Sequence, residues 1–67
     1  MKTNKEIVKF FTDQFDTIKH NSISFEILNI DEVEDVIALY AEMMDIFNNV
    51  TFSKKNKHLT ITIFKTN

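Results

Sequence analysis

The 67-residue chain contains no glycine and no proline, and this limits how it can turn more than any other feature. A chain reversal needs residues that tolerate left-handed backbone, and after glycine asparagine does so best. The asparagines that fall between segments of regular hydrophobic spacing are Asn21, Asn29, Asn48, Asn49 and Asn56. We expect them to divide the chain into its helices and strands.

The first segment has the spacing of an amphipathic helix, predicted over residues 4–20. It opens with Thr3-Asn4-Lys5-Glu6, the pattern of a capping box in which the threonine accepts from the helix and the glutamate reaches back. Lysines, a threonine and an aspartate occupy the polar side. The opposite side carries Ile7, Phe11, Gln14, Phe15 and Ile18.

Residues 22–29 alternate between apolar and other side chains, which predicts a strand that is half-buried on one face. Residues 50–54 and 58–65 alternate in the same way. They predict a hairpin whose turn is Lys55-Asn56-Lys57.

A second helix is predicted from the pattern Asp31-Glu32-Val33-Glu34, which matches a second capping box with acids at the positive end of the helix dipole. We expect this helix to run to about Asn48. Its apolar residues cover an arc of about 180°, so it is expected to contact two neighbours.

Together these elements predict one α+β domain over residues 1–67. The strand–helix–strand crossover is expected to be right-handed, which places its helix on one sheet face. We expect a two-layer α/β sandwich with two helices on one face of a three-stranded mixed sheet. The strand at 58–65 is expected in the centre because it is the longest and most apolar. The predicted outer face of the sheet carries Ser24, Glu26, Leu28, Thr51, Ser53, Thr60, Thr62 and Phe64.

Composition argues against several classes of function. Without cysteine the chain has no disulfide and no thiolate metal site, and His20 and His58 lack the spacing of zinc ligands. Without glycine it has no phosphate-binding loop. No nucleophile–base–orienter set appears, so we expect no catalytic residue, cofactor, metal or small-molecule substrate. No apolar run is long enough for a membrane span, and no secretory signal precedes the domain, so a cytoplasmic protein is expected.

Charge is strongly polarised along the chain. Residues 1–25 carry four lysines and three acids, residues 26–49 carry seven acids and no base, and residues 50–67 carry four lysines and no acid. These sums of +1, −7 and +4 give the net charge of −2. A small net charge therefore hides two regions of opposite sign, and such regions steer partners.

The polar side of the second helix predicts a partner-binding ridge. It carries four acids with Ala38 and Ala41 between them, and no lysine is interleaved to pair with them. We expect this ridge to dock on a basic surface of a larger nucleic-acid-processing protein, by imitating the spacing of nucleic-acid phosphates. The ordinary alternative is a solvated helix face. The predicted partner-binding residues are Glu34, Asp35, Glu42 and Asp45.

In size, acidity and lack of cysteine the chain is similar to the small inhibitors that bacteriophages encode, anti-CRISPR proteins among them. This similarity is one of size and charge, and no motif carries it. It implies a non-enzymatic inhibitor or modulator that acts in the cytoplasm of a host cell.

Two alternatives remain open. The first is a homo-oligomeric structural or regulatory protein that pairs through Leu39, Ile46, Leu28 or Phe64. The second is a weak nucleic-acid binder in which the hairpin lysines act with Phe64 and His58. It ranks last because the acidic segment repels phosphates. The lysines of this second alternative are Lys54, Lys55, Lys57 and Lys65.

Overall fold

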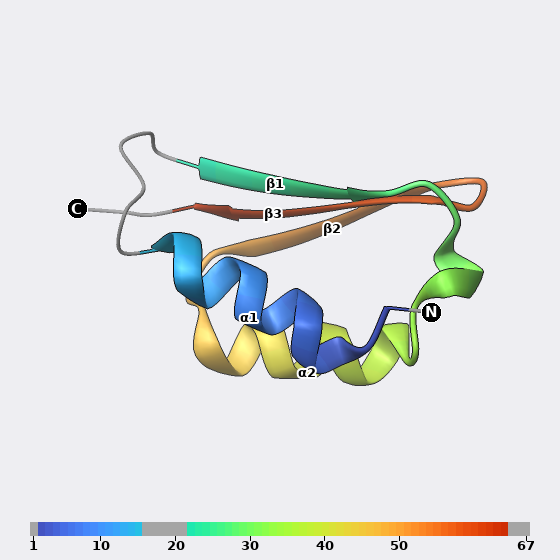
Figure 1. Cartoon of the computed structure of the whole chain (residues 1–67). Helices are drawn as coiled ribbons and strands as arrows, with labels where there is room; N and C mark the ends of the chain where they lie inside the picture. Colours follow the sequence, from blue (N-terminus) through green and yellow to red (C-terminus); the bar gives the residue numbers. More distant parts are fainter. Residues whose placement is uncertain (1, 16–21, 65–67) are drawn as a thin grey trace.

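A computed structural model describes residues 2–15 and 22–64 and shows an α+β fold, which confirms the predicted class (Figure 1). In Figure 1 both helices lie on the same side of the sheet. The elements in chain order are α1 (Asn4–Phe15), β1 (Ser22–Ile27), the 3₁₀ helix η1 (Ile30–Glu32), α2 (Val36–Ile46), β2 (Val50–Lys55) and β3 (His58–Phe64).

The sheet has the strand order β1-β3-β2, so β3 is central as predicted. Both ladders are antiparallel, with Phe25 opposite Ile61 and Phe52 opposite the same Ile61. The prediction of a mixed sheet is therefore wrong. β1 and β2 do run in the same direction, but β3 separates them, so the parallel pair that a mixed sheet needs does not form.

Asparagine takes the turn positions that the sequence assigns to it. Asn56, in the β2–β3 turn, has a φ of 57° and is the one non-glycine residue with positive φ in the described part of the chain. Asn29 caps η1, and its side-chain oxygen accepts a hydrogen bond from the backbone N–H of Asp31 (3.0 Å). Asn48 and Asn49 connect α2 to β2. Asn21 lies outside the described residues.

α1 starts where the capping pattern predicts. The hydroxyl of Thr3 accepts a hydrogen bond from the backbone N–H of Glu6 (3.2 Å), which satisfies one of the unpaired donors of the first turn. Ile7 and Phe11 are buried on the inner side of the helix. The predicted continuation of this helix to residue 20 falls partly on residues 16–20, which are not described.

α2 starts at Val36, so the predicted start at the Asp31 capping box is wrong. Extended backbone at Lys2 pairs in parallel with Val33: its N–H donates to the Glu32 oxygen (2.7 Å), and its oxygen accepts from the Glu34 N–H (3.0 Å). These bonds hold Val33 in extended backbone, a conformation that an α-helix cannot adopt. The helix also ends at Ile46, slightly before the predicted Asn48.

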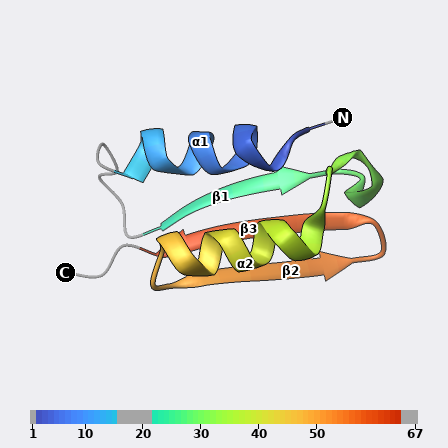
Figure 2. The same ribbon diagram turned by 90° about the horizontal axis from the view of Figure 1, so that it is seen from below.

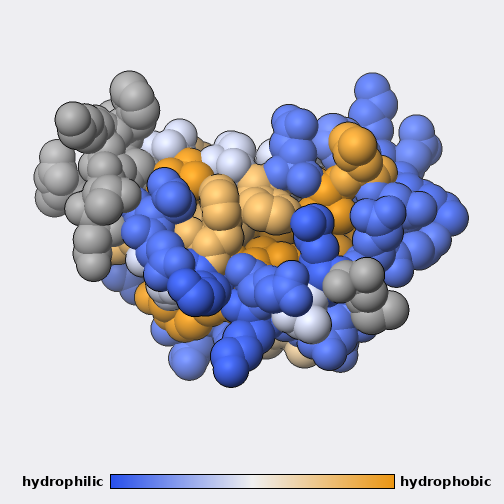
Figure 3. All heavy atoms as spheres, viewed as in Figure 1, coloured by the Kyte–Doolittle hydropathy of each residue, from blue (hydrophilic) through white to orange (hydrophobic). Residues whose placement is uncertain are grey.

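The core lies between the helices and the inner face of the sheet. Figure 3 shows apolar side chains gathered between the sheet and the helices on the face seen in Figure 1. Aromatic rings join α1 to the sheet, since the centroids of Phe10 and Phe25 lie 4.8 Å apart. They also join α1 to the end of α2, since the centroids of Phe11 and Phe47 lie 6.4 Å apart. The fully or nearly fully buried apolar residues are Ile7, Phe11, Ile27, Val33, Leu39, Met43, Phe47, Leu59, Ile61 and Ile63.

The outer face of the sheet carries the hydroxyl residues that alternation predicts. Ser24 and Thr62 lie opposite each other, and their hydroxyl oxygens are 2.9 Å apart. Phe64 is the large apolar side chain of this face. Leu28, predicted for the same face, lies beyond the end of β1.

We predict that replacing Asn56 with alanine lowers the free energy of unfolding by about 1 kcal/mol, because a Cβ without a compensating polar side chain is unfavourable at positive φ. Asn56→Gly should leave stability unchanged or raise it. Urea denaturation followed by circular dichroism measures both. Asn48→Ala is the matched control, expected within about 0.5 kcal/mol of the parent, and an equal loss at both positions would contradict the prediction.

Candidate partner-binding surface

α2 is the element with the most unusual composition, because nine of its eleven residues are apolar and they extend well beyond the side that faces the core. Leu39 and Met43 face the core and are fully buried. Ile37, Tyr40 and Met44 nonetheless remain exposed. A helix of this kind is ordinarily buried on more than one side. Its exposed surface is therefore the first place to look for a partner.

The acidic flank of α2 consists of Ala38, Glu42 and Asp45, together with Asp35 at the start of the helix. At 3.6 residues per turn these positions fall within about 80° of one another. Glu42 and Asp45 are exposed, and neither forms an ion pair with any lysine or histidine of the described residues. Their negative charge is thus directed to solvent.

Glu34 does not belong to this flank, although the sequence predicted it there. One of its carboxylate oxygens accepts a hydrogen bond from the backbone N–H of Asn4 (3.2 Å). The side-chain amide nitrogen of Asn4 donates to the Asp35 carbonyl oxygen (2.9 Å), and its side-chain oxygen accepts from the backbone N–H of Asp35 (3.3 Å). Asn4 is buried, and it joins the start of α1 to the start of α2. The sequence does not reveal this role of Asn4, because the partners lie about thirty residues apart.

Asp35 is the N-cap of α2. Its carboxylate accepts a hydrogen bond from the backbone N–H of Ala38 (3.1 Å), which is what an N-cap aspartate does. It is still exposed, so it adds negative charge to the acidic flank while it stabilises the helix. The sequence assigned the capping role to Asp31 instead.

Asp31 is neutralised from within the molecule. It accepts a hydrogen bond from the Lys57 ammonium (2.7 Å), so the turn between β2 and β3 meets the acidic segment here. The pKa of Lys57 is raised from its ordinary value, because the Asp31 carboxylate both accepts its hydrogen bond and attracts its charge. Lys57 is therefore a hairpin lysine whose charge is already paired within the molecule.

The apolar flank of α2 lies on its other side, toward β2, and consists of Ile37, Tyr40, Ala41 and Met44. Ile37 is 83% exposed. The ring of Tyr40 packs edge-on against the ring of Phe52 in β2, with the two ring centroids 5.0 Å apart. Between this flank and β2 runs an apolar groove of ≈ 270 Å³. The groove is lined by Ile30, Val36, Ile37, Tyr40, Phe52, Lys54 and Leu59.

The four residues predicted as an oligomer surface do not form one patch. Leu39 is 0% exposed, so its assignment to the surface is wrong: it packs into the core. Ile46 borders a hollow beside Phe15 of α1. Leu28 and Phe64 are exposed near opposite ends of β1, because the register places Phe64 opposite Ser22.

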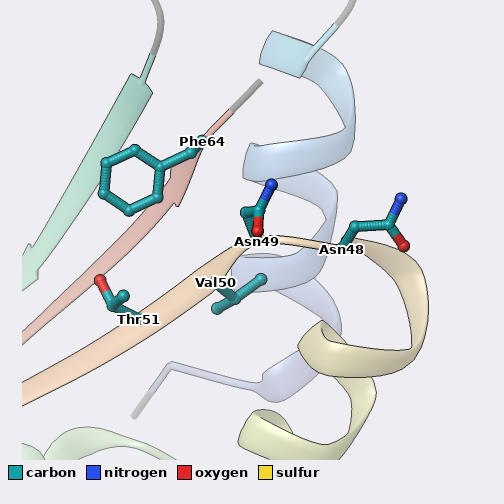
Figure 4. Close-up of a pocket in the computed structure, with 5 residues that line it drawn as sticks. All are labelled: Asn48, Asn49, Val50, Thr51 and Phe64. Carbon is teal, nitrogen blue, oxygen red and sulfur yellow. The ribbon is translucent and has the colours of Figure 1, made fainter. Parts of the chain in front are cut away.

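The remaining candidate groups provide little chemistry. The Nε2 atom of His58 lies 3.9 Å from a Glu26 oxygen on the outer face of the sheet. No group of three or more potential metal ligands occurs among residues 2–15 and 22–64. A hollow of ≈ 450 Å³ at the start of β2 has no ionisable side chain among the described residues that line it (Figure 4). Its lining residues are Asn48, Asn49, Val50, Thr51 and Phe64.

Comparison with models of protein families, with curated proteins and with solved structures finds no match to this chain. Within the described residues, no helix has the length and apolar character needed to cross a membrane.

We predict that Asp35→Ala lowers the free energy of unfolding by about 1 kcal/mol, since it leaves the Ala38 N–H without its capping acceptor. Glu42→Ala removes a side chain of the same helix that has no ion pair among the described residues, and it should change this free energy by less than about 0.5 kcal/mol. Thermal and urea denaturation at neutral pH compare the two variants. Equal losses would show that the cap does not stabilise α2.

The burial of Leu39 leads to a second prediction. Leu39→Ala should cost about 2–5 kcal/mol because it opens a cavity between α2 and the sheet. Ile46→Ala removes a similar volume from the same helix at a position that is 45% exposed, so its cost should be clearly smaller. Urea denaturation measures both, and a small loss for Leu39→Ala would contradict its place in the core.

Proposed function

We propose that this protein is a non-enzymatic interaction module that docks the acidic flank of α2 on a basic surface of a larger nucleic-acid-processing protein. One observation carries the proposal: Glu42 and Asp45 are exposed and lack an ion pair among the described residues, while Asp13 and Asp31 are paired with lysines. In this proposal the binding blocks or modulates the larger protein, as a small phage-type inhibitor of anti-CRISPR character would. The proposed place of action is the cytoplasm.

A cationic partner relieves an unfavourable arrangement in the free protein. Glu42 and Asp45 lie one helical turn apart, where two like charges repel, and Asp35 adds a third charge at the start of the same helix. Ala38 lies between these acids and is small enough to let a partner approach closely. Complementary charge of this kind raises the rate of encounter and sets orientation.

The proposal includes the two-layer arrangement predicted from the sequence, with both helices on one face of the sheet. In that arrangement the acidic flank points away from the sheet and toward solvent. The flat outer face of the sheet then remains separate from the proposed binding surface.

Direct binding of nucleic acid has weaker support. Lys57 is already paired with Asp31, and Lys54 lines the groove under α2 instead of joining an open basic face. Phe64 is the only aromatic residue of the outer sheet face in the described chain. One stacking platform and few free cations make a poor phosphate-binding surface.

We predict that Glu42→Gln combined with Asp45→Asn weakens binding to the target by at least about tenfold, since both unpaired charges are lost. The matched control is Glu6→Gln with Glu32→Gln, which changes the net charge equally at exposed positions away from the flank. Its affinity should remain close to that of the parent.

The probes for this test are purified basic nucleic-acid-processing proteins, RNA-guided nucleases first, measured by biolayer interferometry between about 0.05 and 0.5 M NaCl. Affinity of the parent protein should fall steeply as salt rises. Equal binding by the two double variants, or binding that salt does not change, would contradict the proposal.

A further inference from the structure

β2 has a free edge that its own chain leaves uncovered. In Figure 2, α1 lies alongside β1, whereas no described element lies beyond β2. The Phe64 N–H donates to the Asn49 oxygen (2.9 Å), so Asn49 and Phe64 belong to a hydrogen-bonded pair of the β2–β3 ladder. Hydrogen-bonded and non-hydrogen-bonded pairs alternate along an antiparallel ladder. Thr51, Ser53 and Lys55 therefore bond to β3, and their neighbours along β2 direct N–H and C=O outward. These outward-facing residues are Val50, Phe52 and Lys54.

The apolar flank of α2 runs beside this free edge. Tyr40 stacks on Phe52, one of the outward-facing residues, so the groove and the unpaired backbone belong to one surface. Ile37 and Met44 remain exposed along the same flank. Unpaired backbone next to exposed apolar side chains is the arrangement to which an added strand binds.

We propose that the occupant is a second copy of this chain, whose β2 pairs in antiparallel register with the first around a two-fold axis at Phe52. In this register Phe52 lies opposite Phe52 of the second copy, and Val50 lies opposite Lys54. All three outward-facing residues then exchange hydrogen bonds, about six in total at two for each pair. A shift of two residues in either direction leaves one of them without a partner within β2. The result is a continuous six-stranded sheet.

Charge supports this self-pairing. An inward-pointing lysine on an edge strand ordinarily prevents association of sheets, and Lys54 is such a residue. In the register centred on Phe52, the two copies of Lys54 lie at opposite ends of the paired strands, each beside Val50 of the other copy. Only three residues separate Val50 from the end of α2, so each lysine approaches the negative end of a helix dipole.

The same two-fold axis brings the apolar flanks of the two α2 helices together in antiparallel orientation. Ile37 near the start of one helix then faces Met44 near the end of the other, and the two Tyr40 rings lie near the axis. The side chains that the monomer leaves exposed lose their contact with water. Burial of this kind matters for a chain of 67 residues, since a core of this size leaves stability marginal.

Sedimentation equilibrium from about 1 to 200 µM tests the association. The parent protein should behave as a dimer that dissociates on dilution. Ile37→Lys, on the apolar flank, should raise the dissociation constant at least about tenfold. Leu28→Lys is the control, because Leu28 is 79% exposed and lies away from β2, so its dimer should persist. A parent that is monomeric throughout, or equal effects of both variants, would overturn the proposal.

Cysteine cross-linking tests the register itself. The chain has no cysteine of its own, so any disulfide must come from the introduced cysteines. Around Phe52, Thr51 of one copy lies opposite Ser53 of the other in a non-hydrogen-bonded pair, with the Cα atoms about 4.5 Å apart. A mixture of Thr51→Cys and Ser53→Cys proteins should form a mixed disulfide dimer on mild oxidation. Both side chains are exposed on the outer face, so neither substitution disturbs the core.

Either variant alone should cross-link much more slowly than the mixture, since identical cysteines are not opposite each other in this register. Cross-linking that is as fast in one variant alone as in the mixture would overturn the register. The dimer uses the apolar flank and the β2 edge, whereas the proposed function uses Glu42 and Asp45. Loss of dimerisation in Ile37→Lys with retained target binding therefore separates the two proposals.

Discussion

The position of α2 depends on a short length of extended backbone that pairs Lys2 with Val33. Its hydrogen bonds to Glu32 and Glu34 hold the chain extended, so the helix starts only at Val36. Asn4, buried next to this bridge, then joins the starts of the two helices. The acids that precede the helix are used in different ways: Asp31 pairs with Lys57, Glu34 accepts from the Asn4 backbone, and Asp35 caps α2.

Once α2 is fixed, its two exposed flanks have different chemistry. The flank with Glu42 and Asp45 presents charge that no described lysine neutralises, and the flank with Ile37 and Tyr40 presents apolar surface beside an unpaired strand edge. Charge favours rapid and salt-sensitive encounter, whereas apolar burial and backbone pairing favour lasting association. One short helix can therefore serve two interactions without conflict.

Much of the candidate surface was predictable because its signals are local. The acids, the alanine between them and the absence of lysine on α2 are all visible in the sequence, and Glu42 and Asp45 lie where periodicity places them. Glu34 was misplaced because its partner, Asn4, is thirty residues away. Leu39 was misplaced because the apolar residues of α2 cover a wide arc, so periodicity alone could not show which of them face the core.

The sequence by itself determined the helices and strands, the central place of β3 and the asparagine turns, since side-chain alternation and backbone preference act over a few residues. Tertiary structure alone decided the start of α2, the antiparallel pairing throughout the sheet and the uncovered edge of β2. Each of these depends on contacts between distant segments, and the free energy of such contacts outweighs the weak local preference of a capping pattern.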